Sequence, residues 1–202
     1  MNCCKPSFID IYTKYYCEEN VWHLCNHVKQ HCKRELDDCF VVFVSNETRS
    51  VPLWYQKAGR SDDGLVVWDY HVIFIHKNKQ ATAYEVYDLD SSLTFPCDFL
   101  EYTSKVLKCD ELLQAQFHRS FRVIAASQYL EHFASDRRHM INKAGDWLKP
   151  PPKYNPILTS ASTFNLDNYI EMFKNEAPGE ILDLKQFVAK FCDPVLLHRG
   201  MD

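Results

Sequence analysis

The sequence predicts an α+β fold in which a mainly antiparallel sheet is flanked by helices. Three observations support this prediction. Residues 17–31 place apolar side chains at helical spacing, segments 39–45 and 66–76 are rich in β-branched and aromatic residues, and short helical and strand-like segments alternate later in the chain. No repeat or low-complexity tract divides the 202 residues, so residues 1–202 are expected to form a single domain.

The amino-terminal part of the chain predicts a lead-in followed by a helix. Residues 1–14 show no period and are expected to be extended, whereas the helix should run from Cys17 to about His31. Glu18 and Glu19 would occupy the first turn, where carboxylates favour the positive end of the helix dipole. Cys17 therefore falls at a helix N-terminus, a position that stabilises a thiolate.

The remaining elements are predicted from periodicity and from breaker residues. They are strands over 39–45 and 51–56, a polar loop over 58–64, a strand over 66–76, a turn over 77–80, a returning strand over 82–88, a helix over 104–117, a strand over 121–125, a helix over 128–139, a proline-rich connection over 149–156, and two helices capped by Asn165 and Asp183.

Composition and charge exclude several classes of protein. The net charge of −4 argues against a dedicated nucleic-acid binder, and no apolar stretch approaches the roughly 18 residues of a membrane span. The amino terminus does not resemble a secretory signal, so a cytoplasmic location, with the nucleus as a second site, is expected. The nine cysteines should then be reduced, and most of them buried in the core, namely Cys25, Cys39, Cys97, Cys109 and Cys192.

The predicted hairpin brings a histidine and an aspartate together. If residues 77–80 form its loop, His76 pairs with Ala81 and His71 pairs with Val86. Asp88 is then a diagonal neighbour of His71 on the same sheet face, about 7–8 Å away between backbones. A six-residue loop would place the two directly opposite each other, whereas an odd register would separate them.

A cysteine at a helix N-terminus, packed against such a pair, has the parts of a thiol catalyst. His71 can take the thiol proton, and Asp88 can orient the imidazole. The same order occurs in papain-like and transglutaminase-like enzymes, so a core of that kind is predicted. By itself the pattern is not specific, because nine histidines and nine cysteines generate such pairs by chance.

Seven segments, in order, resemble the protein N-terminal glutamine amidohydrolase family. The resemblance spans about residues 12–192, which is nearly the whole chain. The segments are Tyr16–Trp22, Ser45–Glu47, Val67–Val72, Tyr87–Asp90, Phe95–Cys97, Phe133–Arg137 and Pro150–Pro152.

The resemblance implies an activity and its residues. The family's catalytic cysteine, histidine and aspartate correspond to Cys17, His71 and Asp88. The implied reaction converts an N-terminal glutamine to glutamate through a thioester and releases ammonia, with no cofactor and no metal. Its partners would be proteins or peptides with a free N-terminal glutamine, its product could feed arginylation machinery in N-degron turnover, and a monomer is expected.

Recognition of a free N-terminus calls for an acid that binds the α-ammonium. The candidates are Glu18, Glu19, Glu47, Asp69 and Asp90, although most acids of this kind are solvated surface groups. Trp68 and Tyr70 flank the histidine, and each either lines the substrate pocket or belongs to the core.

Three other interpretations stay open. His23, His27 and His31 are spaced one helical turn apart and could share a metal, but a solvated helix face explains them equally well. The same triad would serve a papain-like protease or a transglutaminase. The chain could also be a non-catalytic binding module that keeps the fold. The pair Arg137–Arg138 is expected at the surface.

Overall fold

The computed structural model describes residues 12–79, 83–174 and 176–192. Its helices are α1 (Cys17–His31), α2 (Phe99–Tyr102), α3 (Ala126–His132), α4 (Leu166–Ile170) and α5 (Leu184–Phe191). Its strands are β1 (Cys39–Ser45), β2 (Val51–Leu53), β3 (Val66–Trp68), β4 (His71–Asn78), β5 (Ala83–Tyr87), β6 (Cys97–Asp98), β7 (Ser120–Ala125) and β8 (Glu180–Asp183).

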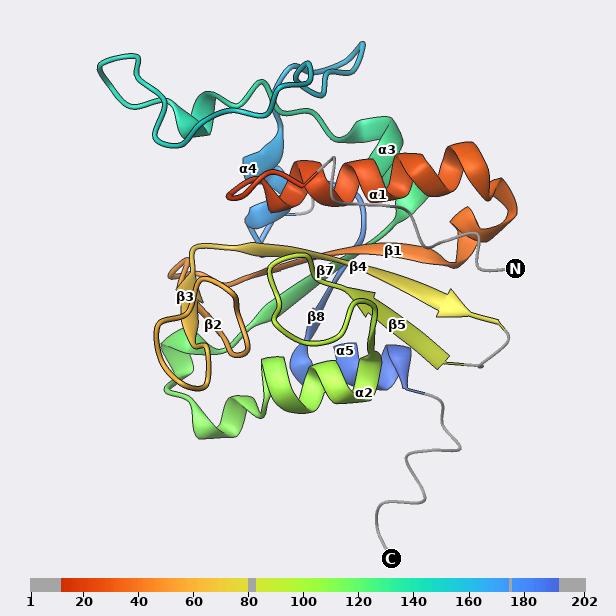
Figure 1. Ribbon diagram of the computed structural model, residues 1–202, viewed down its shortest axis with the longest axis vertical. Helices are drawn as coiled ribbons and strands as arrows, with labels where there is room; N and C mark the ends of the chain where they lie inside the picture. The colour runs from red at the N-terminus through yellow and green to blue at the C-terminus, as the bar shows by residue number, and fades with distance from the viewer. Residues whose placement is uncertain (1–11, 80–82, 175, 193–202) are drawn as a thin grey trace, which may run out of the picture.

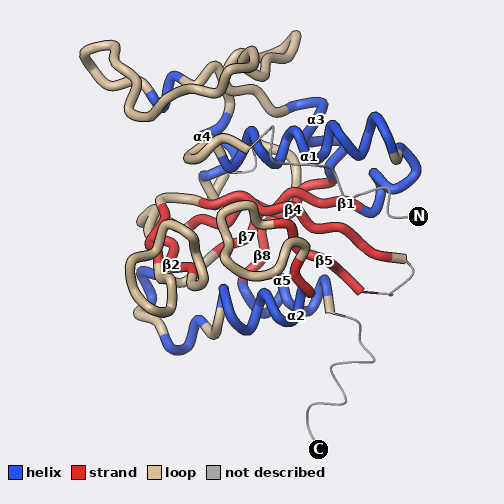
Figure 2. The backbone as a smooth tube through the Cα atoms, in the orientation of Figure 1, coloured by secondary structure: helices blue, strands red, loops and turns tan. Residues whose placement is uncertain are grey.

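A six-stranded sheet in the order β6-β5-β4-β1-β7-β8 forms the centre, and every neighbouring pair in it is antiparallel. Strands β2 and β3 pair in a small second sheet. Helices α1, α3 and α4 lie on one face of the large sheet, and α2 and α5 lie on the other (Figures 1 and 2). The predicted α+β fold with a mainly antiparallel sheet is therefore confirmed. A papain-like or transglutaminase-like core stays a prediction.

Two cores result from the alternation of side chains along buried strands. On β1, Val41 and Phe43 join the cluster beneath α1, α3 and α4, whereas Val42 and Val44 join the cluster beneath α2 and α5. This double burial explains why β1 is a nearly continuous apolar run rather than an alternating one. No helix among the described residues is long and apolar enough to cross a membrane.

Several predicted elements are confirmed. Helix α1 begins at Cys17 and ends at His31, and strand β1 covers 39–45, as predicted. Asp183 caps α5 in a capping box with Gln186, in which each side chain bonds the other's backbone. At these elements, the local sequence signals are strong enough to determine the secondary structure of the folded protein.

The predicted strand over 66–76 was wrong as a single element. The chain breaks at Asp69, whose side chain accepts a hydrogen bond from the Tyr70 N–H, and β3 and β4 then belong to different sheets. Strand β4 also continues through Lys77 and Asn78, where a turn was predicted. Residues 80–82 of that hairpin, like lead-in residues 1–11, lie outside the described residues.

The helix predicted over 104–117 was also wrong. Helix α2 starts earlier because Asp98 caps it, and after a π-helical turn at Thr103–Leu107 the chain reaches Lys108 with a left-handed φ of 55°. Two short 3-10 turns follow, Asp110–Leu112 and Ala115–Phe117. Cys109, expected in the core, is exposed.

The helix predicted over 128–139 ends at His132. Asn165 was expected to cap α4, but its side chain instead bonds the Ala134 N–H and the His132 carbonyl, and so holds the chain leaving α3. Arg137, expected at the surface, is buried, whereas its neighbour Arg138 is exposed.

Candidate active site

The site begins with a buried histidine–aspartate pair at the start of β4. The β4–β5 ladder places His76 opposite Glu85, not opposite Ala81 as predicted. This shift is even, so His71 and Asp88 keep the same sheet face. The His71 Nε2 lies 2.9 Å from the Asp88 Oδ1, and both side chains are buried.

Asp88 is held by several donors. Besides His71, it accepts hydrogen bonds from the Tyr102 hydroxyl at 2.8 Å, the Asp90 N–H at 3.0 Å and the Gln56 amide at 3.4 Å. Burial raises the pKa of Asp88, but the charge of His71 and these hydrogen bonds outweigh it and lower that pKa overall. Asp88 is therefore an ionised, fixed partner for the imidazole.

His71 keeps one ring nitrogen available. Its Nε2 faces Asp88, while its Nδ1 is buried and has no hydrogen-bond partner within the described part of the chain. The Trp68 ring stacks on the imidazole with centroids 5.1 Å apart and fixes its plane. Burial lowers the pKa of His71, but the Asp88 carboxylate raises it by more. Nδ1 is thus the position from which His71 can exchange a proton.

Cys17 lies at the first position of α1, as predicted, and is partly exposed. The backbone of Val72, the residue after His71, lies close enough to lower the pKa of the thiol, and the thiol itself lies 3.6 Å from Glu18 Oε2. No hydrogen bond joins the thiol directly to the imidazole. Burial and the charges of Glu18 and Asp90 raise the pKa of Cys17, which favours the neutral thiol.

The start of α1 offers donors to an oxyanion. Tyr16, the N-cap residue, makes no side-chain capping bond. The first N–H groups of a helix have no partner inside the helix. The N–H groups at Cys17 and Glu18 are therefore suited to a developing negative charge.

The two glutamates of the first turn are buried in different ways. Glu19 forms a two-pronged ion pair with Arg137, at 2.9 Å and 2.8 Å, and both of its oxygens are used. Glu18 accepts from the Tyr70 hydroxyl at 3.0 Å, and its second oxygen lies 3.5 Å from His139 Nε2. Glu18 thus belongs to the surroundings of the thiol, whereas Glu19 anchors the segment around Arg137.

The other three acids are spread over the site's surroundings. Asp90 is 8% exposed, and one of its oxygens lies within 4.8 Å of ligand atoms of His71 and Asp88. Asp69 is exposed, and its carboxylate accepts from the next N–H of the chain. Glu47 is exposed in the turn after β1, and no contact among the described residues links it to Cys17.

The two aromatic candidates differ as well. Trp68 is half-buried and covers His71, in keeping with a pocket wall. Tyr70 is buried in the α1 core, with its hydroxyl directed at Glu18. Sequence reasoning missed Tyr102, Gln56 and Tyr12, because no spacing rule links residues so distant in the chain to Asp88 or Asp90.

In the described part of the chain, the histidines of α1, His23, His27 and His31, do not form a metal-binding group. His71, Asp88 and Asp90 are the one group within the described residues whose ligand atoms are close enough to hold an ion, and two of them are bonded to each other. His27 and His31 stack on one another at 4.2 Å, while His23 packs edge-on against Tyr154.

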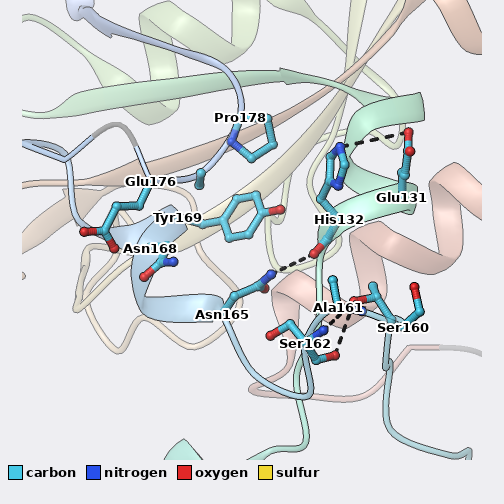
Figure 3. A pocket seen from close by; sticks show the side chains of 12 residues that line it. Glu131, His132, Ser160, Ala161, Ser162, Asn165, Asn168, Tyr169, Glu176 and Pro178 are labelled. Atoms are coloured by element: carbon cyan, nitrogen blue, oxygen red, sulfur yellow. Dashed lines mark hydrogen bonds and ion pairs between the residues drawn. The ribbon is translucent and has the colours of Figure 1, made fainter.

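A cavity of about 540 Å³ lies elsewhere, between the end of α3, the loop before α4 and residues 176–178 (Figure 3). Its lining includes Glu131, His132, Asn168 and Tyr169, and none of the triad residues. The cavity is therefore separate from Cys17, His71 and Asp88.

The fold and the site together define a class: an α+β protein in which a cysteine at a helix N-terminus lies near a buried His–Asp pair. Comparison with known proteins defines it further. The sequence model of the N-terminal glutamine amidase family matches residues 12–191. The chain belongs to this family.

Similar relatives include fly proteins named protein N-terminal glutamine amidohydrolase. Those of Drosophila grimshawi, Drosophila melanogaster and Drosophila willistoni are each 49% identical over 180 residues, covering 89% of this chain and 87% of the relative. The similarity therefore covers all three triad positions, which lie between Cys17 and Asp88.

Proposed function

We propose that this protein is an enzyme that hydrolyses the side-chain amide of an N-terminal glutamine to give glutamate and ammonia. Family membership supports the reaction. The observation that supports a thiol mechanism is the buried His71–Asp88 pair with its unused Nδ1, on the strand against which the helix of Cys17 packs.

The first half of the reaction forms a thioester. Cys17 transfers its proton to His71 Nδ1 as the sulfur bonds the amide carbon, and the carbonyl electrons move onto oxygen. The N–H groups at the start of α1 stabilise this oxyanion. The C–N bond then breaks, the nitrogen takes the proton from His71, and ammonia leaves.

The second half regenerates the enzyme. His71 takes a proton from water, and the hydroxide attacks the thioester carbon. The C–S bond breaks, Cys17 regains the proton and glutamate is released. Throughout, Asp88 stabilises the charged imidazole and keeps Nδ1 turned away from itself.

The substrate ammonium needs an acid that is both close and reachable. Glu19 is occupied by Arg137, Glu47 is solvated in its turn, and Asp69 is exposed, which weakens any ion pair. Glu18 and Asp90 remain, because both are buried and the charges of both act on the Cys17 thiol. Trp68 supplies an apolar wall for the glutamine methylenes.

We place the enzyme upstream of arginylation, since an N-terminal glutamate is the product that such machinery would take. The proposed setting is the cytoplasm, with the nucleus as a second compartment, and the proposed form is a monomer. Each of these three points follows from the family resemblance and the sequence.

The test is ammonia release from two peptides that differ only in a free or acetylated N-terminal glutamine. The wild type should release ammonia from the free peptide alone, Cys17→Ala should release none, and Cys109→Ala, a change at an exposed cysteine, should behave as wild type. Equal release from the acetylated peptide would show a general glutaminase. Release from neither, with cleavage or amine transfer instead, would show a protease or a transglutaminase.

A binding module without catalysis has its own signature. If Cys17 reacted with iodoacetamide no faster than Cys109 and no ammonia appeared, the proposed function would be wrong.

A further inference from the structure

We propose that Asp90, held in place by the Tyr12 hydroxyl, binds the α-ammonium of the substrate, and that Tyr12 is therefore a positioning residue for N-terminal specificity. This inference rests on the proposed function.

Tyr12 links the lead-in to the triad. Its hydroxyl donates a hydrogen bond to Asp90 Oδ1 at 2.5 Å, across 78 positions of sequence. Burial, the hydrogen bond to Asp90, and the charges of Asp90, Asp88 and Cys17 raise the pKa of Tyr12. The hydroxyl therefore stays protonated and can donate to the carboxylate.

The backbone beneath Tyr12 is fixed. The Asn20 side chain accepts from the Thr13 N–H at 2.8 Å and donates to the Thr13 carbonyl at 2.9 Å, and Asn20 is buried in α1. A side-chain amide that satisfies both backbone groups of one residue holds that residue to the helix. Tyr12 is thus directed at Asp90 from the element that carries Cys17.

The backbone beneath Asp90 is fixed as well. Its N–H donates to Asp88 Oδ1 at 3.0 Å, and its carbonyl accepts from the Lys57 N–H at 2.8 Å. The Tyr12 hydroxyl then sets the orientation of the carboxylate. A pre-oriented acid loses little entropy on binding a cation.

The local charge suits an ammonium. Two carboxylates, Asp88 and Asp90, lie within 4.8 Å of one imidazole, and Cys17 lies in the field of Asp90. An arriving ammonium would offset the charge that disfavours the thiolate. A free N-terminus would then promote attack as well as binding, which an acetylated one could not do.

Glu18 is the rival acid, and its surroundings favour it less. Its Oε2 is occupied by the Tyr70 hydroxyl, and its Oε1, which has no hydrogen-bond partner among the described residues, is inaccessible to solvent and lies beside His139. Asp90 is also largely buried but remains 8% exposed, whereas Glu18 is fully buried.

The experiment compares a glutamine-starting peptide with a desamino peptide in which hydrogen replaces the α-ammonium. The measured quantity is the ratio of kcat/KM for the two peptides. Asp90→Asn should lower this ratio about 100-fold, the size expected when a desolvated charge pair loses one partner. Tyr12→Phe should lower it about tenfold, mainly through a higher KM for the glutamine peptide.

The pH dependence gives a second readout. The ratio for wild type should fall as pH rises through about 8, the usual pKa of an α-amino group, and this fall should vanish in Asp90→Asn. Melting temperature and the circular dichroism spectrum show that each variant is folded.

Three results would overturn the inference. An equal loss for both peptides in Asp90→Asn would mean that Asp90 acts through Asp88 and His71. A fall in the kcat/KM ratio in Glu18→Gln but not in Asp90→Asn would show that Glu18 binds the ammonium. An unchanged ratio in Tyr12→Phe would remove Tyr12 from specificity. No ammonia from wild type with the glutamine peptide would instead refute the proposed function itself.

Discussion

Two buried ionic clusters near the start of α1 differ in how completely their charges are matched. In one, Glu19 and Arg137 form a two-pronged pair, and Arg137 donates further to the carbonyls of Pro152 and Tyr154. In the other, Asp88 and Asp90 share a single imidazole, whose second nitrogen has no partner within the described chain.

The difference separates a structural cluster from a reactive one. A buried ion pair that serves folding is neutral and fully bonded, because any unmatched charge costs several kcal/mol. The His71 cluster carries excess negative charge and an unused ring nitrogen, a state that only a substrate would complete. Burial alone therefore does not distinguish the two clusters, whereas the unused Nδ1 of His71 does.

The largest expected effect is on turnover and comes from the reactive cluster. Asp88→Asn keeps the shape of the side chain but removes its charge and the preferred tautomer of His71. We expect kcat to fall on the order of 10⁴-fold, as in other triads. The measurement is steady-state ammonia release, with Asp62→Asn as the control at an exposed loop acid. A loss below tenfold would mean that Asp88 is not the orienting acid.

The next largest effect is on stability and comes from the structural cluster. Arg137→Met leaves Glu19 buried without its partner, and should lower the free energy of unfolding by about 3–5 kcal/mol. Adding Glu19→Gln should recover part of that loss. Urea unfolding measures both, with Arg138→Met as the exposed control, expected to change stability by less than about 0.5 kcal/mol. Equal losses at positions 137 and 138 would contradict the comparison.

Both low pH and high pH should reduce the stability that the His71–Asp88 pair contributes. The lowered pKa of Asp88 adds stability that is complete above its ordinary value of about 3.9 and is lost as pH falls through the folded pKa. The raised pKa of His71 adds stability that is complete below about 6.5 and is lost as pH rises through the folded pKa. The combined contribution is therefore greatest between about pH 4 and 6.5.

Urea unfolding of wild type and Asp88→Asn across pH measures this contribution as their difference. That difference should peak in the stated window and shrink on both sides. A difference that does not vary with pH would mean that the pair is not ionised in the folded protein. The His71 imidazole, followed by NMR, should titrate at lower pH in Asp88→Asn.

The sequence was sufficient to predict the elements that are determined by local patterns. The apolar stripe and acidic first turn predict α1 from Cys17 to His31, and Asp183 with Gln186 predicts the start of α5. The His71–Asp88 pair was predicted from strand alternation, which survives any even error in register.

The sequence did not predict the features that depend on contacts between residues far apart in the chain. Tyr102 and Gln56 bond Asp88, and Arg137 bonds Glu19. The partners are far apart in the chain, so no periodicity of the sequence predicts these contacts. The helix predicted over 104–117 failed for the same reason, because Arg119 bonds Asp110 and the Leu107 carbonyl and holds this segment in another path. Buried arginines of this kind cannot be told from surface ones by local composition.

The smallest effects compare two buried tyrosine hydroxyls, one inside the reactive cluster and one outside it. Tyr102 donates to Asp88 at 2.8 Å, whereas the Tyr169 hydroxyl is buried with no hydrogen-bond partner among the described residues. Tyr102→Phe should lower the free energy of unfolding by about 1.5 kcal/mol, the contribution of a hydrogen bond to a charged group, and lower kcat about tenfold. Tyr169→Phe should change either quantity little, since removing an unbonded buried hydroxyl is close to neutral or stabilising. Equal losses in the two variants, by urea unfolding and ammonia release, would show that Tyr102 contributes through packing alone, and that the bonds into Asp88 do not set its orientation.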